Sequence, residues 1–487
     1  MPPASHAATI LHLLAGLDTA GVERALGDPG HPAFTHAAAL ADSADSADES
    51  ERGAGLGALF AGLVEPLNDS FRPAGRAAYA RLFTHIVWRT CARDPALTRG
   101  LASFSIPDEA ALYARYARAR RGTDPLPTGP VRRILILSRV TIGADVLLTT
   151  VVVQRLHQRF PDAELVILGD AKLSGLVGGL PQVRVRSLAY GRRGPLRERL
   201  GAWLGLVEAV TAETPDLVVA PDSRLDQLGI LPVTADPARY LLWENTLPDD
   251  LPAESLAAAV DRALARRLGL AGPRIMPRVA FDGPTENQRQ RLAAAFGPAP
   301  LAAVKLDHGG NPAKALPRAA EVALLRHLKS AGWRILLDRG FGPAELANSD
   351  ALLHDAGWTG VDIDDSGKGL GLDVSHLAPG ALAGATVIRF HGSIGGWAAA
   401  LAGCGLAVSY DSVGHHLAAA LGVPLVTAFT GHPDQRFATA WSPQGPGKVT
   451  VVEIPTEMKE QPEQWERVMK ECLNARMLEC SNERTTG

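Results

Sequence analysis

The chain has 487 residues, of which 46% are hydrophobic and 21% are charged, and its formal net charge is -3. This length exceeds one ordinary hydrophobic core, so two or three domains are expected. The near-neutral charge and an aromatic content of 5% argue against nucleic acid as a partner, because they provide neither a basic field nor a base-stacking platform. No apolar run approaches the roughly 20 residues that span a bilayer.

Cysteine usage and the N-terminus predict a cytoplasmic location. The four cysteines (Cys91, Cys404, Cys472 and Cys480) are scattered without Cys-x-x-Cys spacing, which favours free thiols over a zinc site or a disulfide framework. Residues 1–6 lack the charged and apolar parts of a secretory signal.

Residues 1–130 are expected to form a helical extension. Apolar residues recur at helical spacing within 10–17 and again within 79–87. The acidic low-complexity stretch 41–51 is predicted to be a loop, and the Gly- and Pro-rich stretch 122–130 is predicted to be a linker.

Residues 131–282 and 283–455 are predicted to form two tandem Rossmann-like, doubly wound α/β domains with a cleft between them. Short continuous apolar runs indicate buried parallel strands. The runs are 134–138, 165–169, 216–220 and 240–243 in the first domain, and 302–306, 334–337, 386–390, 406–409 and 425–429 in the second. A helix is expected over 145–160. Residues 456–487 are expected to form a polar helix and tail that crosses back to the N-terminal extension.

The stretch 411–424 has the pattern of an anion site. An apolar strand runs into a short polar turn, and the turn opens an Ala-rich helix that ends at Gly422. A helix N-terminus offers unpaired N–H groups and the positive end of its dipole. Asp411 lies where a capping or a hydroxyl-binding carboxylate would lie. His416 lies inside the helix, where a histidine is more often packed than catalytic.

Polar residues follow three further strands, at the edge where open α/β sheets bind ligands. Asp145 is either the N-cap of its helix or a carboxylate that takes a proton from a hydroxyl. Lys314 and Asn311 lie in the Gly-rich loop 308–317, where Lys314 is either a phosphate ligand or a surface lysine. Ser393 precedes a helix over 394–401, and capping is the simpler interpretation of it.

In this order, these elements resemble glycosyltransferase family 9, the ADP-heptose:lipopolysaccharide heptosyltransferase group. The family pattern Asp-Ser/Thr-Gly-x-x-His-Leu-Ala-Ala-Ala-Leu-Gly-x-Pro is matched by Asp411, Ser412, His416, Leu417, Ala418, Ala419, Ala420, Leu421, Gly422 and Pro424. The family's Phe-Gly segment and its Trp-x-Pro element recur as 429–431 and 441–443.

The remaining family elements are weaker. Its Lys-x-Trp-Pro element is echoed by 314–317, its Ile-Gly-Asp loop by 142–150, and its Phe-Pro-x-Ala element by 160–163. The resemblance covers about 131–452. The chain departs from the family by an extra Ala144 before Asp145, by Val413 in place of the motif glycine, with Gly414 next to it, and by Leu316 in place of tryptophan.

The resemblance implies a GT-B fold and an inverting, metal-independent transfer of a heptose-like sugar from a nucleotide-sugar donor. It implies that Asp145 is the base. It also implies that Lys314, Asn311, Ser393, Asp411, Ser412, Gly414 and His416 bind the donor, which is expected to be ADP-linked. No cofactor is expected. The expected acceptor is a glycan, a glycolipid or a protein, and a glycolipid would bring the enzyme to the inner membrane as a peripheral protein.

A basic run in the first domain is the expected acceptor contact. It consists of Arg184, Arg186, Arg192, Arg193, Arg197 and Arg199. Arginine suits phosphate and carboxylate groups, and a solvated helix face explains the run equally well. Arg139, Arg192 and Arg193 are the acceptor candidates. Two other functions remain open, a sugar-nucleotide epimerase or hydrolase of the same architecture and a non-catalytic nucleotide-binding assembly protein.

Overall fold

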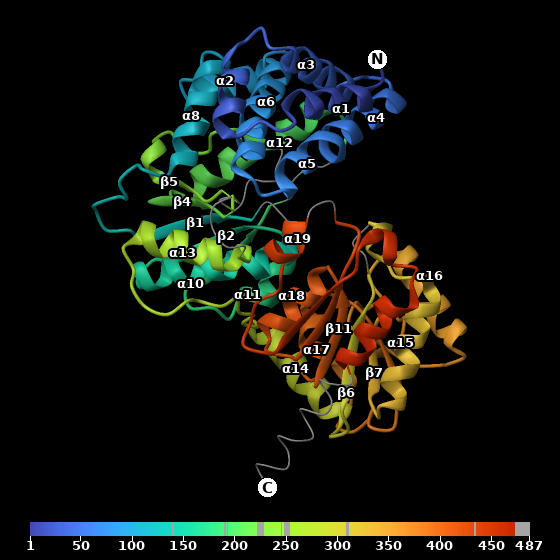
Figure 1. Cartoon of the computed structure of the whole chain (residues 1–487). Coiled ribbons are helices and arrows are strands. Elements are labelled where there is room, and N and C mark those ends of the chain that lie inside the picture. Colours follow the sequence, from blue (N-terminus) through green and yellow to red (C-terminus); the bar gives the residue numbers. More distant parts are fainter. Residues whose placement is uncertain are drawn as a thin grey trace.

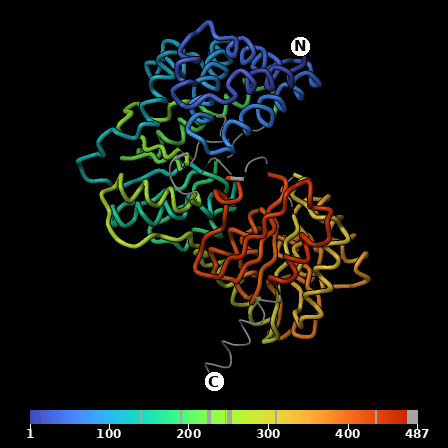
Figure 2. The backbone as a smooth tube through the Cα atoms, in the orientation of Figure 1, coloured from blue at the N-terminus to red at the C-terminus, as the bar shows by residue number. Residues whose placement is uncertain are grey.

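The computed structural model describes residues 1–138, 141–188, 191, 193–221, 228–244, 246–247, 254–307, 311–432 and 435–472. Figure 1 shows three bodies in chain order: a block of helices, a unit built on one sheet and a unit built on a second sheet. The backbone tube follows the same order, with the first sheet unit between the helical block and the second sheet unit (Figure 2).

The N-terminal block contains α-helices and one π-helical turn. These are α1 (Pro3–Leu14), α2 (Thr19–Gly27), α3 (Pro32–Ala44), α4 (Glu49–Leu59), the π turn η1 (Phe60–Val64), α5 (Glu65–Asp69), α6 (Pro73–Cys91), α7 (Pro95–Ser103) and α8 (Glu109–Arg121). The prediction of a loop over 41–51 was wrong in extent. Helix α3 runs through Ala44, and α4 begins at Glu49 because Asp48 caps it by accepting from the Glu51 N–H at 2.7 Å.

The first sheet has five parallel strands in the order β3-β2-β1-β4-β5. The strands are β1 (Arg133–Leu137), β2 (Glu164–Gly169), β3 (Val183–Ser187), β4 (Leu217–Ala220) and β5 (Tyr240–Leu242). Their helices and turns are α9 (Ile142–Ala144), the π turn η2 (Asp145–Thr149), α10 (Thr150–Arg159), η3 (Ala171–Leu173), α11 (Ser174–Val177), α12 (Leu196–Glu213), η4 (Pro237–Arg239) and α13 (Leu256–Leu268). Strand β3 was not predicted.

The second sheet has eight parallel strands in the order β13-β12-β11-β6-β7-β10-β8-β9. The strands are β6 (Leu301–Lys305), β7 (Arg334–Asp338), β8 (Val361–Asp364), β9 (Leu372–Asp373), β10 (Val387–His391), β11 (Leu406–Tyr410), β12 (Leu425–Phe429) and β13 (Val449–Glu453). The helices and turns are α14 (Gly283–Phe296), η5 (Pro312–Lys314), α15 (Arg318–Ser330), α16 (Pro343–Ala356), η6 (Val374–His376), α17 (Ile394–Leu401), α18 (Val413–Ala420), α19 (Gln435–Ala440) and η7 (Thr456–Met458). The predicted class, tandem α/β sheets after a helical extension, is confirmed.

Strand order locates the crevice of each sheet. The chain leaves β1 in one direction for β2 and later returns to its other side for β4, and β6 stands in the same way between β7 and β11. Ligands of open α/β sheets bind at such switch points, beyond the carboxyl ends of the strands. The segments that follow β1, β6 and β11 carry Asp145, Lys314 and Asp411.

Three hydrophobic clusters hold the molecule together. One joins a face of each sheet, through α10 and α13 on the first and α14, α17 and α18 on the second. Another joins the opposite face of the first sheet to α12 and the N-terminal block. A third covers the far face of the second sheet and includes Val468 and Cys472. The C-terminal segment up to Cys472 thus packs its apolar side on the second unit rather than on the N-terminal block, and the rest of the expected C-terminal helix and tail, 473–487, lies outside the described residues. No described helix is long and apolar enough to cross a membrane.

Candidate functional site

Asp145 lies in a π-helical turn directly after the first turn of its helix. Thr141 is the N-cap and accepts from the Ala144 N–H at 3.5 Å, so the capping role considered for Asp145 was wrong. In η2 the Thr150 N–H donates to the Asp145 carbonyl, five residues back, and such a turn holds one residue more than an α-helical turn.

The Asp145 carboxylate is buried and orientated by two hydroxyl groups. Its side chain is 3% exposed. Ser138, at the end of β1, donates to Oδ2 at 2.7 Å, and Thr149, one turn along the helix, donates to Oδ1 at 2.7 Å. The geometry holds a carboxylate at the crevice edge of the first sheet.

The turn after β11 opens α18 through Ser412. Its side chain accepts from the Gly414 N–H at 3.4 Å, so Ser412 is the cap and the position first considered for Asp411 belongs to its neighbour. Val413 begins the helix without a positive φ, so its side chain is tolerated there. A Cβ at Gly414 would lie 2.7 Å from Lys305 Cδ, so a side chain here would displace the buried Lys305 side chain.

Asp411 forms an ion pair with Lys314 across the switch point of the second sheet. Lys314 Nζ is 2.6 Å from Asp411 Oδ2 and donates to the Asp411 carbonyl at 3.1 Å. The lysine side chain is 20% exposed and the aspartate 9%. Lys314 also lies over the Phe437 ring, 5.8 Å from its centroid. One cation and one carboxylate thus meet beside the N-terminus of α18.

The two histidines of the turn are buried and neutral. Burial lowers the pKa of both rings well below the ordinary value. Lys314 lowers the pKa of His415 further, and His415 lowers that of His416 further. The His415 ring stacks on Phe429, and the His416 ring faces Trp441. Among the described residues neither His415 Nε2 nor His416 Nδ1 has a hydrogen-bond partner, although His415 Nε2 lies 3.7 Å from Asp411 Oδ1. His416, predicted to bind the donor, is placed in the wall behind the turn.

The first sheet unit reaches this turn through α9 and η2, which both pack against α18. A Cβ at Gly143 would lie 3.2 Å from His416 Cδ2 and 3.5 Å from Val413 Cα. The absence of a side chain at Gly143 therefore lets the two helix N-termini approach closely. Asp145 and Asp411 are more than 260 positions apart in the sequence. Asp145 lies in η2, which packs against α18, and Asp411 lies just before α18.

A cleft of about 240 Å³ lies beyond β6 and β7. Its polar lining includes Asp307, Asp338, Arg339, Glu345 and Asn348. At its base Lys305, the last residue of β6, pairs with Asp338, the last residue of β7. This pairing raises the pKa of Lys305 although burial opposes it. These residues were not predicted, but their positions at strand ends could have identified them.

Ser393 caps α17 and is engaged within the protein. Its side chain accepts from the Gly396 N–H at 2.9 Å. Its N–H and hydroxyl donate to Asp365 at 2.6 and 2.8 Å. Gln288 donates to the same carboxylate at 2.9 Å. Asp365 therefore already occupies the N-terminus of this helix.

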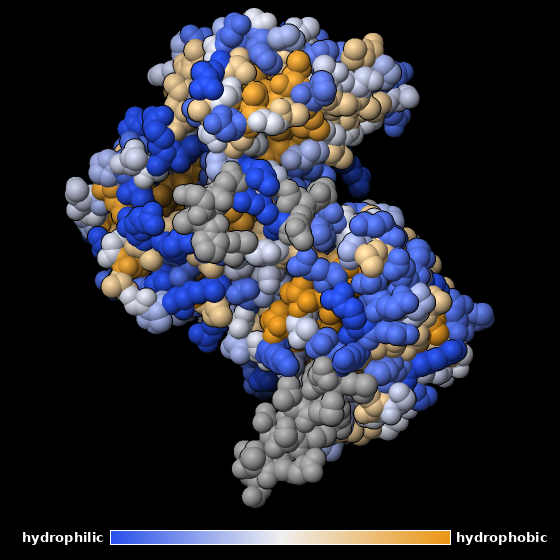
Figure 3. All heavy atoms as spheres, in the orientation of Figure 1, coloured by the Kyte–Doolittle hydropathy of each residue, from blue (hydrophilic) through white to orange (hydrophobic). Residues whose placement is uncertain are grey.

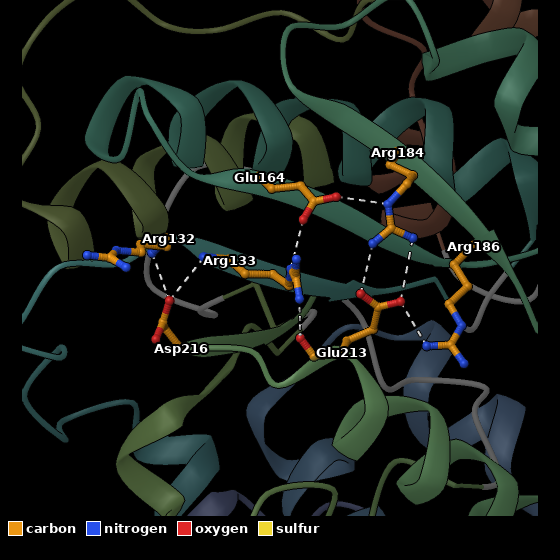
Figure 4. A network of polar contacts seen from close by, with 7 residues as sticks. All are labelled: Arg132, Arg133, Glu164, Arg184, Arg186, Glu213 and Asp216. Atoms are coloured by element: carbon orange, nitrogen blue, oxygen red, sulfur yellow. Dashed lines mark hydrogen bonds and ion pairs between the residues drawn. The ribbon is translucent and has the colours of Figure 1, made fainter.

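Arg184 and Arg186 of the basic run belong to a network of ion pairs within the protein (Figure 4). Arg184 and Arg186, on β3, pair with Glu213 at 2.8 Å each, and Arg184 and Arg133 both pair with Glu164. The hydrogen bonds from Arg184 lower the pKa of both glutamates. Arg184 and Arg186 lie on a strand, whereas Arg197 and Arg199 lie on helix α12, as the helix-face interpretation expects.

The other predicted ligands lie apart from this network. Arg193 is exposed. Asn311 caps η5 by accepting from the Ala313 N–H at 3.0 Å. Arg139 and Arg192 lie outside the described residues, as do 308–310 of the Gly-rich loop. No cluster of three or more His, Cys, Asp or Glu side chains able to hold a metal ion occurs among the residues that the structure describes.

Comparison with known proteins bears on this site directly. Residues 388–467, which include Ser393 and the whole α18 turn, match the model of glycosyltransferase family 9, the heptosyltransferases. The predicted resemblance is confirmed. No curated protein sequence matches the chain significantly. The family match supports glycosyl transfer from a nucleotide sugar as the activity of the chain.

Solved structures share the architecture. A family 9 glycosyltransferase from Veillonella parvula is 16% identical with a TM-score of 0.50, and the alignment covers 72% of this chain and 99% of that one. Escherichia coli ADP-heptose lps heptosyltransferase II is 16% identical (TM-score 0.47, 71% and 99%). Escherichia coli heptosyltransferase WaaC, solved with ADP, is 19% identical (TM-score 0.46, 71% and 99%). The first likeness shows a shared fold, and more than a quarter of this chain lies outside it.

Proposed function

We propose that this chain is an inverting, metal-independent glycosyltransferase that moves a heptose-like sugar from a nucleoside diphosphate donor to an acceptor hydroxyl. The observation that carries the proposal is the packing of α9 and η2, with the buried Asp145, against the helix whose N-terminus adjoins Lys314 and Asp411. A proton acceptor and an anion site therefore face one junction between two sheet units.

The proposed donor site uses the N-terminus of α18. Lys314 and the N–H groups around Ser412 and Gly414 would stabilise the charge that grows on the departing diphosphate. Asp411 would accept hydrogen bonds from sugar or ribose hydroxyls, as carboxylates in α/β crevices do. The cleft beyond β6 and β7 lies at the carboxyl ends of the strands of the same sheet and would receive the nucleoside.

The proposed chemistry is one displacement. The acceptor oxygen attacks the anomeric carbon, its proton passes to Asp145, and the bond from the anomeric carbon to the phosphate oxygen breaks as the nucleoside diphosphate leaves. Ser138 and Thr149 hold the carboxylate in place for this step. Attack opposite to the leaving group inverts the anomeric configuration.

The acceptor belongs to the proposal in its general form, as a glycan, a glycolipid or a protein reached in the cytoplasm. Of the arginines expected to contact it, Arg193 is described and exposed. A glycolipid acceptor would require peripheral association with the inner membrane, and the exposed guanidinium would suit its anionic groups.

Calorimetric titration with ADP, UDP, GDP and dTDP, first without metal and then with magnesium, tests the proposal. We expect one diphosphate to bind selectively in the absence of metal, with ADP favoured. Absence of binding by all four would contradict the donor site. Donor turnover without any acceptor would instead favour an epimerase or a hydrolase.

A further inference from the structure

Phe71 connects the N-terminal block to the second sheet unit. It lies between α5 and α6 and is fully buried, and it belongs to the cluster that joins the two sheets rather than to the core of its own block. Its ring lies 6.4 Å from those of Phe437 and Trp441. On the face drawn in Figure 3, a notch separates the block from the second unit. The contact of Phe71 with Phe437 and Trp441 is buried inside the molecule.

The backbone at Phe71 is strained and held from both sides. Its φ is 55°, a left-handed conformation that is an outlier for a bulky side chain. Its N–H donates to the Asn68 carbonyl at 3.0 Å, and the Leu247 N–H donates to the Phe71 carbonyl at 2.8 Å. Such strain persists where the surrounding structure fixes it and concentrates at functional sites.

A buried charge network anchors the same turn. Arg76, at the start of α6, is fully buried and pairs with Glu244 at 3.3 Å, and it also donates to Asn68. Arg120, from α8, pairs with Glu244 at 2.7 Å. Burial opposes ionisation of Glu244, but the two arginines outweigh it and lower the pKa of the carboxyl. The turn is thus fixed to the first sheet unit just beyond β5.

The aromatic residues that meet Phe71 form the back wall of the proposed donor site. Phe437 lies under the Lys314 ammonium, and Trp441 faces the ring of His416. Leu247 completes the junction, because its carbonyl accepts from Arg436 at 3.3 Å while its N–H donates to Phe71. A displacement of Phe71 would therefore reach Lys314 and the α18 turn through two aromatic rings.

We infer that Phe71 is a positioning residue for the donor site, by which the N-terminal block holds α19, and through it Lys314 and the α18 turn, in the binding arrangement. This inference rests on the proposed function. It assigns the helical block a part in donor binding, although the block lies outside the segment that matches the family model.

Phe71→Ala, compared with Phe83→Ala, tests the inference in the full-length protein. Phe83 is an equally buried phenylalanine of the same block, but it packs on Phe60 and Tyr79 and makes no ring contact with the second unit. Both changes should lower the melting temperature. We expect only Phe71→Ala to weaken diphosphate binding, by about tenfold, because small displacements at a preorganised site are costly. Phe71→Leu, which retains apolar volume, should restore most of the affinity.

Two readouts separate the possible results. Calorimetry with ADP, UDP, GDP and dTDP measures affinity, and hydrogen exchange of peptides from 411–421 and 435–442 without ligand measures the positioning itself. Faster exchange in Phe71→Ala but not in Phe83→Ala is expected. Unchanged affinity and exchange in Phe71→Ala, with wild-type binding intact, would overturn the inference alone. A wild-type protein that binds no diphosphate would overturn the proposed function and this inference with it.

Discussion

Asp145 is the residue on which the proposed chemistry depends most directly. Asp145→Asn keeps the shape of the side chain but removes the basic oxygen; its amide oxygen can accept from one of the Ser138 and Thr149 hydroxyls, and its NH2 group would have to donate to the other. We expect kcat to fall by about a hundredfold or more, since general bases typically contribute that much. Diphosphate affinity and melting temperature should stay close to the wild-type values. Steady-state kinetics and calorimetry on the same preparation measure both quantities.

Asp216→Asn is the matched control. Asp216 also lies in the first sheet unit, where it accepts from the Arg132 and Arg133 N–H groups (Figure 4). These groups stand at the start of β1, whereas Asp145 follows the end of that strand. Its substitution should leave kcat unchanged. A loss of diphosphate binding in a folded Asp145→Asn protein would contradict the assignment of this residue as the base.

The Lys314–Asp411 ion pair should determine how tightly the diphosphate binds. Lys314→Ala removes the cation and leaves the Asp411 carboxylate unopposed beside the expected diphosphate. A charge-assisted hydrogen bond is worth about 1.5–3 kcal/mol, so affinity should fall by about 10- to 100-fold. Adding Asp411→Asn should recover part of the loss by removing the repulsion. Lys329→Ala, at a surface lysine of α15, should change nothing, and an equal loss there would exclude a specific role for Lys314.

The buried His415 and His416 predict a pH dependence of stability. Their folded-state pKa values lie well below the ordinary value, so the unfolded chain takes up protons first as the pH falls. Their contribution is complete above about pH 6.5 and declines below it, by at most about 1.4 kcal/mol per histidine for each pH unit. Urea unfolding between pH 7.5 and 5.5 measures the slope. A His415→Gln/His416→Gln variant with the same slope would contradict this origin.

The N-terminus of helix α17 is capped by Ser393. Ser393 and Asp365 satisfy the N-terminus of this helix between them, so the polar groups of Ser393 are used within the protein. Ser393→Ala should lower the free energy of unfolding by about 1 kcal/mol, the usual value of an N-cap, while diphosphate affinity changes less than about twofold. Thermal unfolding and calorimetry test this together. A large loss of affinity without a loss of stability would return Ser393 to the donor site expected from the sequence.

Local patterns predicted the strands that are buried on both faces, together with the edge strand β5, and missed β3, β8, β9 and β13. Strands such as β1 and β12 read as continuous apolar runs because helices cover both sides of the sheet. Strand β3 alternates valine and arginine, and it was read as part of a basic run because only the fold supplies Glu213 and Glu164 as partners. The sequence pattern therefore did not reveal β3, because the strand lies at the edge of the sheet and its ion-pair partners are distant in the sequence.

The candidate site was predictable in its residue types and not in its connections. The turn at Asp411 and the loops at Lys314 and Asp145 follow strands and could be placed at the crevice edge from the sequence. The exact caps, Thr141 and Ser412, lie a few residues from the expected ones because neighbouring polar residues compete for the same N–H groups. The contact of Phe71 with Trp441 joins residues 370 positions apart, and no local pattern encodes it.

At the scale of the whole molecule, the N-terminal block shares one hydrophobic core with the first sheet. One face of that sheet, including Leu135, Leu137 and Val218, shares a cluster with α6, α8 and α12. Trp203 of α12 illustrates the junction, because it packs on Phe104 and a Cβ at Gly100 would lie 2.7 Å from its ring. Removal of the block would expose this face to water, so the block should not behave as an independently folded module.

This coupling predicts how a distant core substitution spreads. Leu82→Ala in α6 removes a buried side chain and should cost about 2–5 kcal/mol. If the block and the first sheet open together, the amides of β1 should lose the same free energy of opening as those of α6. The amides of β7, in the far sheet, should lose much less. Native-state hydrogen exchange measures all three segments at once, and unchanged protection in β1 beside a loosened α6 would show instead that the block opens on its own.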